Sequence, residues 1–147
     1  MSVIVAPLNA EDTAAVRQLL IDGLSERWGA YDPCFNPDLE AFAQSYLGSL
    51  ILVAKTAGAV VGTGTLRSIS PRRVEIVRMS TATTSRRMGV ASAILQQLLE
   101  HARAVGAQEV VLETTSSWSS AVAFYTKHGF ARTREHGGDT HFIQHLR

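Results

Sequence analysis

Apolar residues recur along the chain with two different periods, and each change of period marks a new element. A β-branched run at residues 3–5 predicts a strand. A helical spacing follows after Asn9, the expected N-cap, in the apolar residues Ala14, Val16, Leu19, Leu20 and Leu24. Pro33 and Pro37 then interrupt the period, so we expect an irregular loop and a second short helix that begins after residue 37 or 38.

Three β-rich stretches come next, at residues 50–56, 59–67 and 73–79, separated by the turn signals Ala57-Gly58 and Ser70-Pro71. This spacing predicts an antiparallel meander. Because side chains alternate along a strand, the third stretch is expected to place Glu75, Val77 and Met79 on one face. The other face then carries the remaining members of the stretch, Val74, Ile76 and Arg78.

The second half of the chain returns to a helical period. An apolar stripe at residues 91–105 predicts a helix that starts near Met88 and ends at Gly106. We expect a buried strand at 109–114, a helix at 119–128 capped from Ser116 and Ser117, and closing strands at 130–134 and 140–146. The order is βα(α)βββαβαββ, which we interpret as a single α/β domain over residues 1–147.

Composition agrees with one folded domain and excludes several classes of protein. The chain has 147 residues, of which 46% are hydrophobic and 18% charged, and its net charge is +1. This balance argues against disorder and against nucleic-acid binding through bulk charge. The apolar runs are far shorter than the ~20 residues of a membrane span, and the single cysteine, Cys34, closes no disulfide within the chain. We therefore expect a cytoplasmic protein without nucleic-acid or membrane partners.

Charge is nevertheless unevenly distributed along the sequence. Residues 1–50 carry seven acids against two arginines, a local net charge of −5, whereas residues 51–100 carry seven bases against two acids, a net charge of +5. Such segregation arises by chance on a solvated surface, or it serves two ligands of opposite charge. The sequence leaves both interpretations open.

The segment at residues 83–92 carries the clearest chemical signal. The start of the predicted helix exposes backbone N–H groups and the positive end of the helix dipole, which favour an anion. Arg86 and Arg87 add two charges there, and Gly89 and Ala91 allow close approach to the backbone. Phosphate binding is one interpretation, and an arginine-rich surface turn is the other. Neither a Gly-Lys-Ser/Thr P-loop nor a three-glycine dinucleotide fingerprint is present in this segment.

The same segment resembles the Arg/Gln-x-x-Gly-x-Gly/Ala signature of the GNAT family of N-acetyltransferases, through its residues Arg-Arg-Met-Gly-Val-Ala at 86–91. Residues 74–79 resemble the fourth strand of that family. Residues 121–130 resemble its late Ala-x-x-Phe-Tyr-x-x-x-Gly-Phe segment, and Leu112-Glu113-Thr114 is also typical. The close match covers residues 73–131. It implies the GNAT-type acyl-CoA N-acyltransferase fold, with a mixed, mostly antiparallel sheet flanked by helices.

The resemblance also implies a site for acetyl-CoA as cosubstrate, in a V-shaped opening between the fourth and fifth strands. The backbone of Met79, Ser80 and Thr81 would line the pantetheine arm, next to Tyr125. The pyrophosphate would rest on residues of the loop and the helix start, namely Arg86, Arg87, Gly89, Val90, Ala91 and Ser92. One position departs from the family, because an asparagine common seven residues before the tyrosine is Trp118 here. Ser117 or Ser119 is the alternative hydrogen-bond donor.

Two residues are candidate catalytic groups. The family position of Tyr125 implies the general acid that protonates the departing CoA thiolate, and an ordinary pKa of ~10 keeps a phenol protonated at neutral pH. Glu75 is a candidate general base, direct or through water, while a solvent-facing strand carboxylate is the alternative. Glu113 is a weaker candidate for the base.

Two other residue types suggest chemistry that we do not expect here. Cys34 would suit an acyl-enzyme intermediate, but it has no neighbouring histidine in the sequence. His141 and His145 lack an acidic or cysteine partner placed alongside, which favours surface histidines over a metal site. We therefore expect neither a covalent intermediate nor a metal.

The sequence-based hypothesis is an acetyl-CoA-dependent N-acetyltransferase that transfers the acetyl group directly to a primary amine, through a ternary complex. The rival is a non-catalytic acyl-CoA-binding sensor or interaction module on the same fold. Small molecules and peptides are both open as acceptors, and a homodimer is compatible with a domain of this size.

Overall fold

The computed structural model describes residues 2–147 and contains one seven-stranded sheet in the order β1-β2-β3-β4-β5-β7-β6. The strands are β1 (Ile4–Pro7), β2 (Leu50–Thr56), β3 (Ala59–Ser68), β4 (Arg73–Thr81), β5 (Glu109–Thr115), β6 (Ala131–His136) and β7 (Asp139–His145). The helices are α1 (Thr13–Trp28), α2 (Phe42–Ser45), α3 (Val90–Ala104) and α4 (Ser119–Lys127), with 3-10 turns at Ala10–Asp12, Pro37–Leu39 and Thr83–Ser85. The predicted element order is confirmed.

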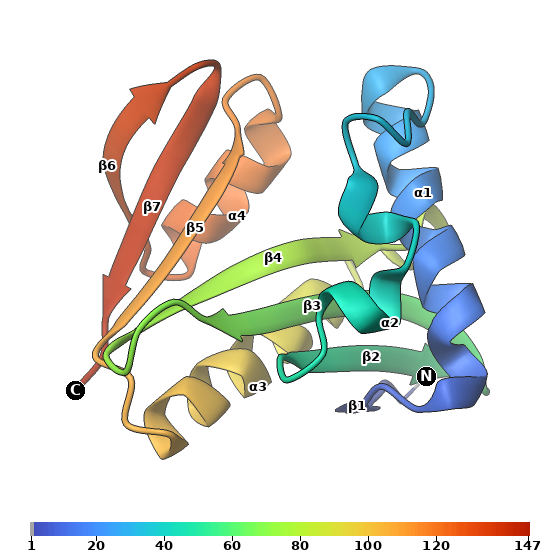
Figure 1. The fold of residues 1–147 in the computed structure, drawn as a ribbon, viewed down its shortest axis with the longest axis horizontal. Coiled ribbons are helices and arrows are strands. Elements are labelled where there is room, and N and C mark those ends of the chain that lie inside the picture. Colours follow the sequence, from blue (N-terminus) through green and yellow to red (C-terminus); the bar gives the residue numbers. More distant parts are fainter. Residues whose placement is uncertain (1) are drawn as a thin grey trace.

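The sheet changes direction once, between β4 and β5. These two strands are parallel neighbours, whereas the other neighbouring pairs are antiparallel. A parallel connection needs a crossover, and α3 supplies it. The β4–β5 pairing covers only Arg73–Glu75 against Glu109–Val111, after which the two strands diverge (Figure 1). We call this divergence the strand split.

Helices cover both faces of the sheet. α1 and α2 pack on one face through Val16, Leu20 and Phe42, against Ile51 and Val53 of β2. α3 packs on the other face with the apolar stripe that the sequence predicts, Ile94, Leu95, Leu98, Leu99 and Ala102. α4 belongs to this second core through Val122 and Tyr125. The split therefore lies between two helical layers.

Glycines in β3 allow α3 to approach the sheet closely. A Cβ built on Gly64 would clash with the Sδ of Met79 and would lie 2.9 Å from a methyl of Ile94. A Cβ built on Gly62 would lie 2.6 Å from a methyl of Val90. Since real Cβ contacts are essentially never this short, a larger residue at either position would push α3 or β4 outward.

The expected alternation of side chains along β4 is wrong beyond Val77, because the strand carries a bulge. The β3–β4 register shifts between Thr63 and Thr65, and Arg78 adopts a left-handed backbone with φ +54°. The extra residue reverses the facing of the residues after it. Met79 packs toward α3, away from the face of Val77, and Arg78 joins the face covered by α1 and α2.

The starts of α3 and α4 also differ from the sequence-based expectation. α3 begins at Val90, two residues after Met88, because Gly89 is left-handed at φ +79°. α4 has no side-chain cap, so the prediction that Ser116 and Ser117 cap it is wrong. The hydroxyl of Ser116 instead lies 2.8 Å from that of Thr140, which ties the loop before α4 to β7.

Candidate active site

The strand split exposes two strand edges toward each other. β4 has no β5 partner from residue 76 to 81, and β5 has no β4 partner from residue 112 to 115. Met79, Ser80 and Thr81 lie at the end of the free stretch of β4, each half-buried. A free strand edge presents backbone N–H and C=O groups that pair with an extended ligand containing amide bonds.

Ser80 also contacts α1, the helix on the face of the sheet opposite α3. A Cβ built on Gly23, in the middle of α1, would lie 2.8 Å from the Ser80 Oγ. Gly23 has ordinary helical geometry, so the absence of a side chain here is a matter of space and not of backbone conformation. The glycine lets α1 lie directly against the end of β4.

The loop after β4 leads into an uncapped helix start. Arg87 at φ +64° and Gly89 at φ +79° are both left-handed, and α3 then begins without a side-chain cap. The first backbone N–H groups of α3 are therefore available to an anion. A Cβ on Gly89 would meet no atom within 4 Å, so backbone conformation, not crowding, favours glycine here.

Arg86 is engaged by a carboxylate of the protein. Its Nη1 and Nη2 donate to Oε1 and Oε2 of Glu26 in α1, at 2.5 and 2.7 Å, and the hydroxyl of Thr83 donates to the same carboxylate at 3.2 Å. Hydrogen bonding from Arg86 lowers the pKa of Glu26 below its ordinary value. An anion that reaches the Arg86 guanidinium must share it with Glu26, whereas the neighbouring Arg87 is exposed.

Ser92 connects the first turn of α3 to the end of α4. Its Oγ lies 3.1 Å from Nε2 of His128, and the imidazole packs on the ring of Phe124 with 4.5 Å between ring centroids. The two helix ends nearest the predicted phosphate loop are therefore joined by a polar contact.

Tyr125 is a buried residue of α4 with 7% of its surface exposed. Its ring packs among Phe124, Phe130 and Phe142, with centroid distances of 5.2 to 6.0 Å. No hydrogen bond joins its hydroxyl to another described residue. Burial raises the pKa of the phenol well above its ordinary value, and the charge of Arg27 offsets only part of that effect. The phenol is therefore protonated at neutral pH and has a proton to donate.

Glu75 lies at the closed end of the split, where β4 still pairs with Val111 of β5. Its Oε1 accepts a hydrogen bond from Nε of Arg67, the residue opposite it in β3, at 2.7 Å, and forms an ion pair with Nη2 of the same guanidinium at 2.6 Å. The carboxylate is thus held by a cation on the face opposite α3, separate from Tyr125 in the α4 layer.

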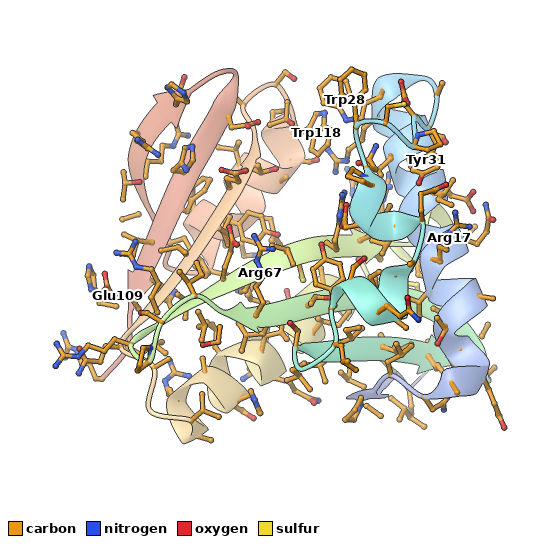
Figure 2. All side chains as sticks on the ribbon, viewed as in Figure 1. Arg17, Trp28, Tyr31, Arg67, Glu109 and Trp118 are labelled. Carbon is orange, nitrogen blue, oxygen red and sulfur yellow. The ribbon has the colours of Figure 1, made fainter. Side chains whose placement is uncertain are left out.

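An aromatic contact across the open end of the split is a feature that the sequence did not indicate. The rings of Trp28, at the end of α1, and Trp118, just before α4, lie 5.3 Å apart (Figure 2). The guanidinium of Arg27 lies 4.6 Å from the centroid of the Trp118 ring. The last turn of α1 therefore contacts the loops on both sides of the split. Glu26 binds Arg86 in the loop after β4, and Trp28 packs on Trp118 in the loop after β5. The partners lie 90 residues apart in the sequence, so no local pattern signals them.

Three ion pairs join the acid-rich residues 1–50 to the base-rich residues 51–100. Glu26 pairs with Arg86, Asp38 with Arg78 at 2.6 Å, and Asp12 with Lys55 at 2.6 Å. Each pair joins residues 1–50 to residues 51–100. Three of the seven acids in residues 1–50 are therefore paired with bases of residues 51–100 within the protein.

The other reactive side chains that the sequence suggested are Cys34 and the histidines of β7. Cys34 is exposed in the loop after α1. The expectation that His141 lacks an acidic partner is wrong, because its Nδ1 lies 3.5 Å from the carboxylate of Glu113, its cross-strand neighbour in β5. Within residues 2–147, no three histidine, cysteine or acidic side chains gather closely enough to hold a metal ion. The same part of the chain contains no helix of the length and apolarity required to span a bilayer.

Comparison with known proteins decides the family. Residues 14–130 match the model of the Acetyltransferase (GNAT) family, which is most of the chain. The chain belongs to this family. It is 32% identical over 120 residues to mouse N-acetyltransferase 8 and 34% identical over 115 residues to human N-acetyltransferase 8B. These matches cover 76% and 72% of the chain, but 53% and 51% of the relatives, so the chain spans about half the length of the curated relatives it matches.

Solved structures agree on the GNAT fold. A GNAT-family acetyltransferase from Staphylococcus aureus superposes with a TM-score of 0.87 at 17% identity, covering 99% of this chain and all of that one. The PaiA N-acetyltransferase of Thermoplasma acidophilum, solved with coenzyme A, superposes at 0.85 with 19% identity, covering 99% and 100% of the two chains. A putative acetyltransferase from Salmonella typhimurium, solved with acetyl-CoA, superposes at 0.78 with 17% identity over 100% and 95%.

Proposed function

We propose that this GNAT protein is an acetyl-CoA-dependent N-acetyltransferase that transfers the acetyl group directly to a primary amine. One observation carries the proposal: an unpaired strand edge in β4 runs into an uncapped helix start flanked by arginines. The edge suits the amide-containing pantetheine arm, and the helix start suits the pyrophosphate. The CoA and acetyl-CoA complexes of two structural neighbours support the same ligand.

In this proposal the backbone of Met79, Ser80 and Thr81 pairs with the pantetheine arm. The pyrophosphate is held by N–H groups at the start of α3 and by arginine side chains, through Arg86, Arg87, Gly89, Val90, Ala91 and Ser92. The left-handed conformations of Arg87 and Gly89 support this assignment, because successive left- and right-handed residues aim N–H groups at one point. Trp118 offers only an indole N–H where many family members have an asparagine amide.

The reaction is an attack by the amine nitrogen on the thioester carbonyl carbon. The N–C bond forms, the C–S bond breaks, and the amine loses one proton while the CoA thiolate gains one. We assign the donation of a proton to the thiolate to Tyr125, because a phenol with an ordinary pKa of ~10 carries its proton at neutral pH. Glu75, direct or through water, is the candidate acceptor of the amine proton, and its carboxylate is paired with Arg67 in the structure.

The alternative is a non-catalytic module that binds acyl-CoA without turnover. Incubation with acetyl-CoA and a panel of amines and peptides, followed by detection of free CoA and of the acetylated product, separates the two. An enzyme releases thiol in proportion to product with at least one acceptor. A module binds CoA in calorimetry but releases no thiol above the rate of spontaneous hydrolysis, and that result would exclude the enzyme for the acceptors tested.

A further inference from the structure

Arg78 is a side chain in an unfavourable backbone conformation at the centre of β4. Its φ of +54° lies in the left-handed region, which costs free energy for residues other than glycine. Such residues persist where their surroundings hold them in place, and they gather at functional sites. Arg78 lies one residue before Met79, within the stretch of β4 that has left β5.

The side chain of Arg78 forms an ion pair with Asp38, in the 3-10 turn Pro37–Leu39 before α2. Nε and Nη2 donate to Oδ2 and Oδ1 of Asp38, at 2.8 and 2.6 Å, in a bidentate arrangement. The hydroxyl of the buried Tyr46 donates to the same carboxylate at 2.5 Å, and Oδ1 of Asn36 accepts from Arg78 at 3.3 Å. The pair is half-buried, so solvent screens it less than a surface pair.

The bulge determines the direction of every backbone group after it. One extra residue against Gly64 turns Met79 toward α3 and leaves Ser80 paired with Thr63. Without that residue the strand end would present the opposite set of N–H and C=O groups to the split. The orientation of residues 79–81 therefore depends on the conformation of Arg78.

We propose that Arg78, held by Asp38, is a positioning residue that fixes the bulge and thereby aims the backbone of residues 79–81 at the acyl-CoA arm. The proposal rests on the proposed function, since that function assigns the arm to this strand edge. Two other roles predict different results: Arg78 as a charge that binds the acceptor, and the Arg78–Asp38 pair as a plain anchor for the segment before α2.

Substitution of Arg78 by glycine and by alanine separates these roles. Both remove the ion pair, but glycine adopts φ +54° without strain, whereas alanine favours a regular strand. We expect Arg78→Ala and Asp38→Asn to lower kcat by about 10- to 100-fold, the scale of a misplaced reacting group. Arg78→Gly should keep about tenfold more activity than Arg78→Ala, and Asp38→Asn/Arg78→Gly should recover activity relative to Asp38→Asn alone.

Arg17→Ala is the matched control, because Arg17 anchors the same segment through the carbonyl of Leu39 and the carboxylate of Glu40 without touching the bulge. We expect it to leave kcat within about twofold of the wild type. Equal loss in Arg78→Gly and Arg78→Ala would show a charge role and overturn the proposal. A loss in Arg17→Ala as large as that in Asp38→Asn would show a plain anchor and overturn it as well.

Urea unfolding provides a readout that does not depend on activity. A protein with glycine in a strand is ordinarily less stable than the same protein with alanine there. If residue 78 is left-handed, the order is reversed, and Arg78→Gly should be more stable to urea than Arg78→Ala. If wild-type protein releases no thiol with any acceptor, the proposed function fails while this order still tests the bulge. The ordinary order would overturn the positioning role whatever the activity.

Discussion

Replacing Tyr125 by phenylalanine tests the mechanism with little change in packing. The ring lies among three phenylalanines, and the hydroxyl makes no hydrogen bond to another described residue. Because Tyr125→Phe keeps the ring and breaks no protein hydrogen bond, we expect the free energy of unfolding to change by less than about 1 kcal/mol. Urea denaturation measures this change, and calorimetry should show CoA affinity close to that of the wild type.

The kinetic effect should be much larger than the effect on stability. A positioned proton donor contributes ~10²-fold or more, equivalent to about 2.7 kcal/mol of transition-state stabilisation. The loss should fall equally on kcat and kcat/KM, since the hydroxyl acts on charge that develops only as the thioester breaks. Slow product release would mask the effect in steady state, so thiol formation is measured in a single turnover.

The raised pKa of Tyr125 adds a prediction about pH. A group whose pKa rises on folding stabilises the native state below its unfolded pKa of ~10, and that stabilisation is lost as pH rises toward the folded value. Because the phenol stays protonated over this range, any fall in kcat between pH 7 and 10 comes from the titration of another group. The same fall should therefore be measured in Tyr125→Phe. Full single-turnover activity of Tyr125→Phe would refute the acid role.

Three further predictions concern the phosphate loop and the ion pairs. Gly89→Val should abolish calorimetric CoA binding in a folded protein, since a β-branched residue disfavours φ +79°; unchanged affinity would contradict the loop assignment. Glu26→Gln should tighten CoA binding several-fold by freeing Arg86, as read from the fluorescence of the chain's two tryptophans; weaker binding would show that the pair supports the site. Burial raises the pKa of Asp38, but hydrogen bonds from Arg78 and Tyr46 outweigh it, so the folded pKa lies below the ordinary value. Its contribution to stability should be present above pH ~4 and lost as pH falls below that, in wild type but not in Asp38→Asn.

Local periodicity was sufficient to predict the elements, and a local motif indicated the candidate phosphate loop. The predicted strand at 50–56 coincides with β2, and the apolar stripe after Gly89 is the face that α3 buries. These predictions succeed because backbone sterics and side-chain spacing act over a few residues, so the information is complete within one segment. The loop motif is equally local, since a left-handed glycine and a helix start are adjacent in the chain.

Only the tertiary structure decided how these elements meet. The β4 bulge depends on Arg78 reaching Asp38, 40 residues away, and the contacts of α1 with both walls of the split depend on partners 60 and 90 residues away. Local periodicity gives no information on such pairs, because they form only when distant segments of the chain pack together. The packing of many other residues then decides the distance between the two partners. The sequence by itself thus determined the family, the order of elements along the chain and the candidate loop. The ion pair of Arg86 with Glu26, the direction in which Met79 faces and the contact between Trp28 and Trp118 came from long-range packing.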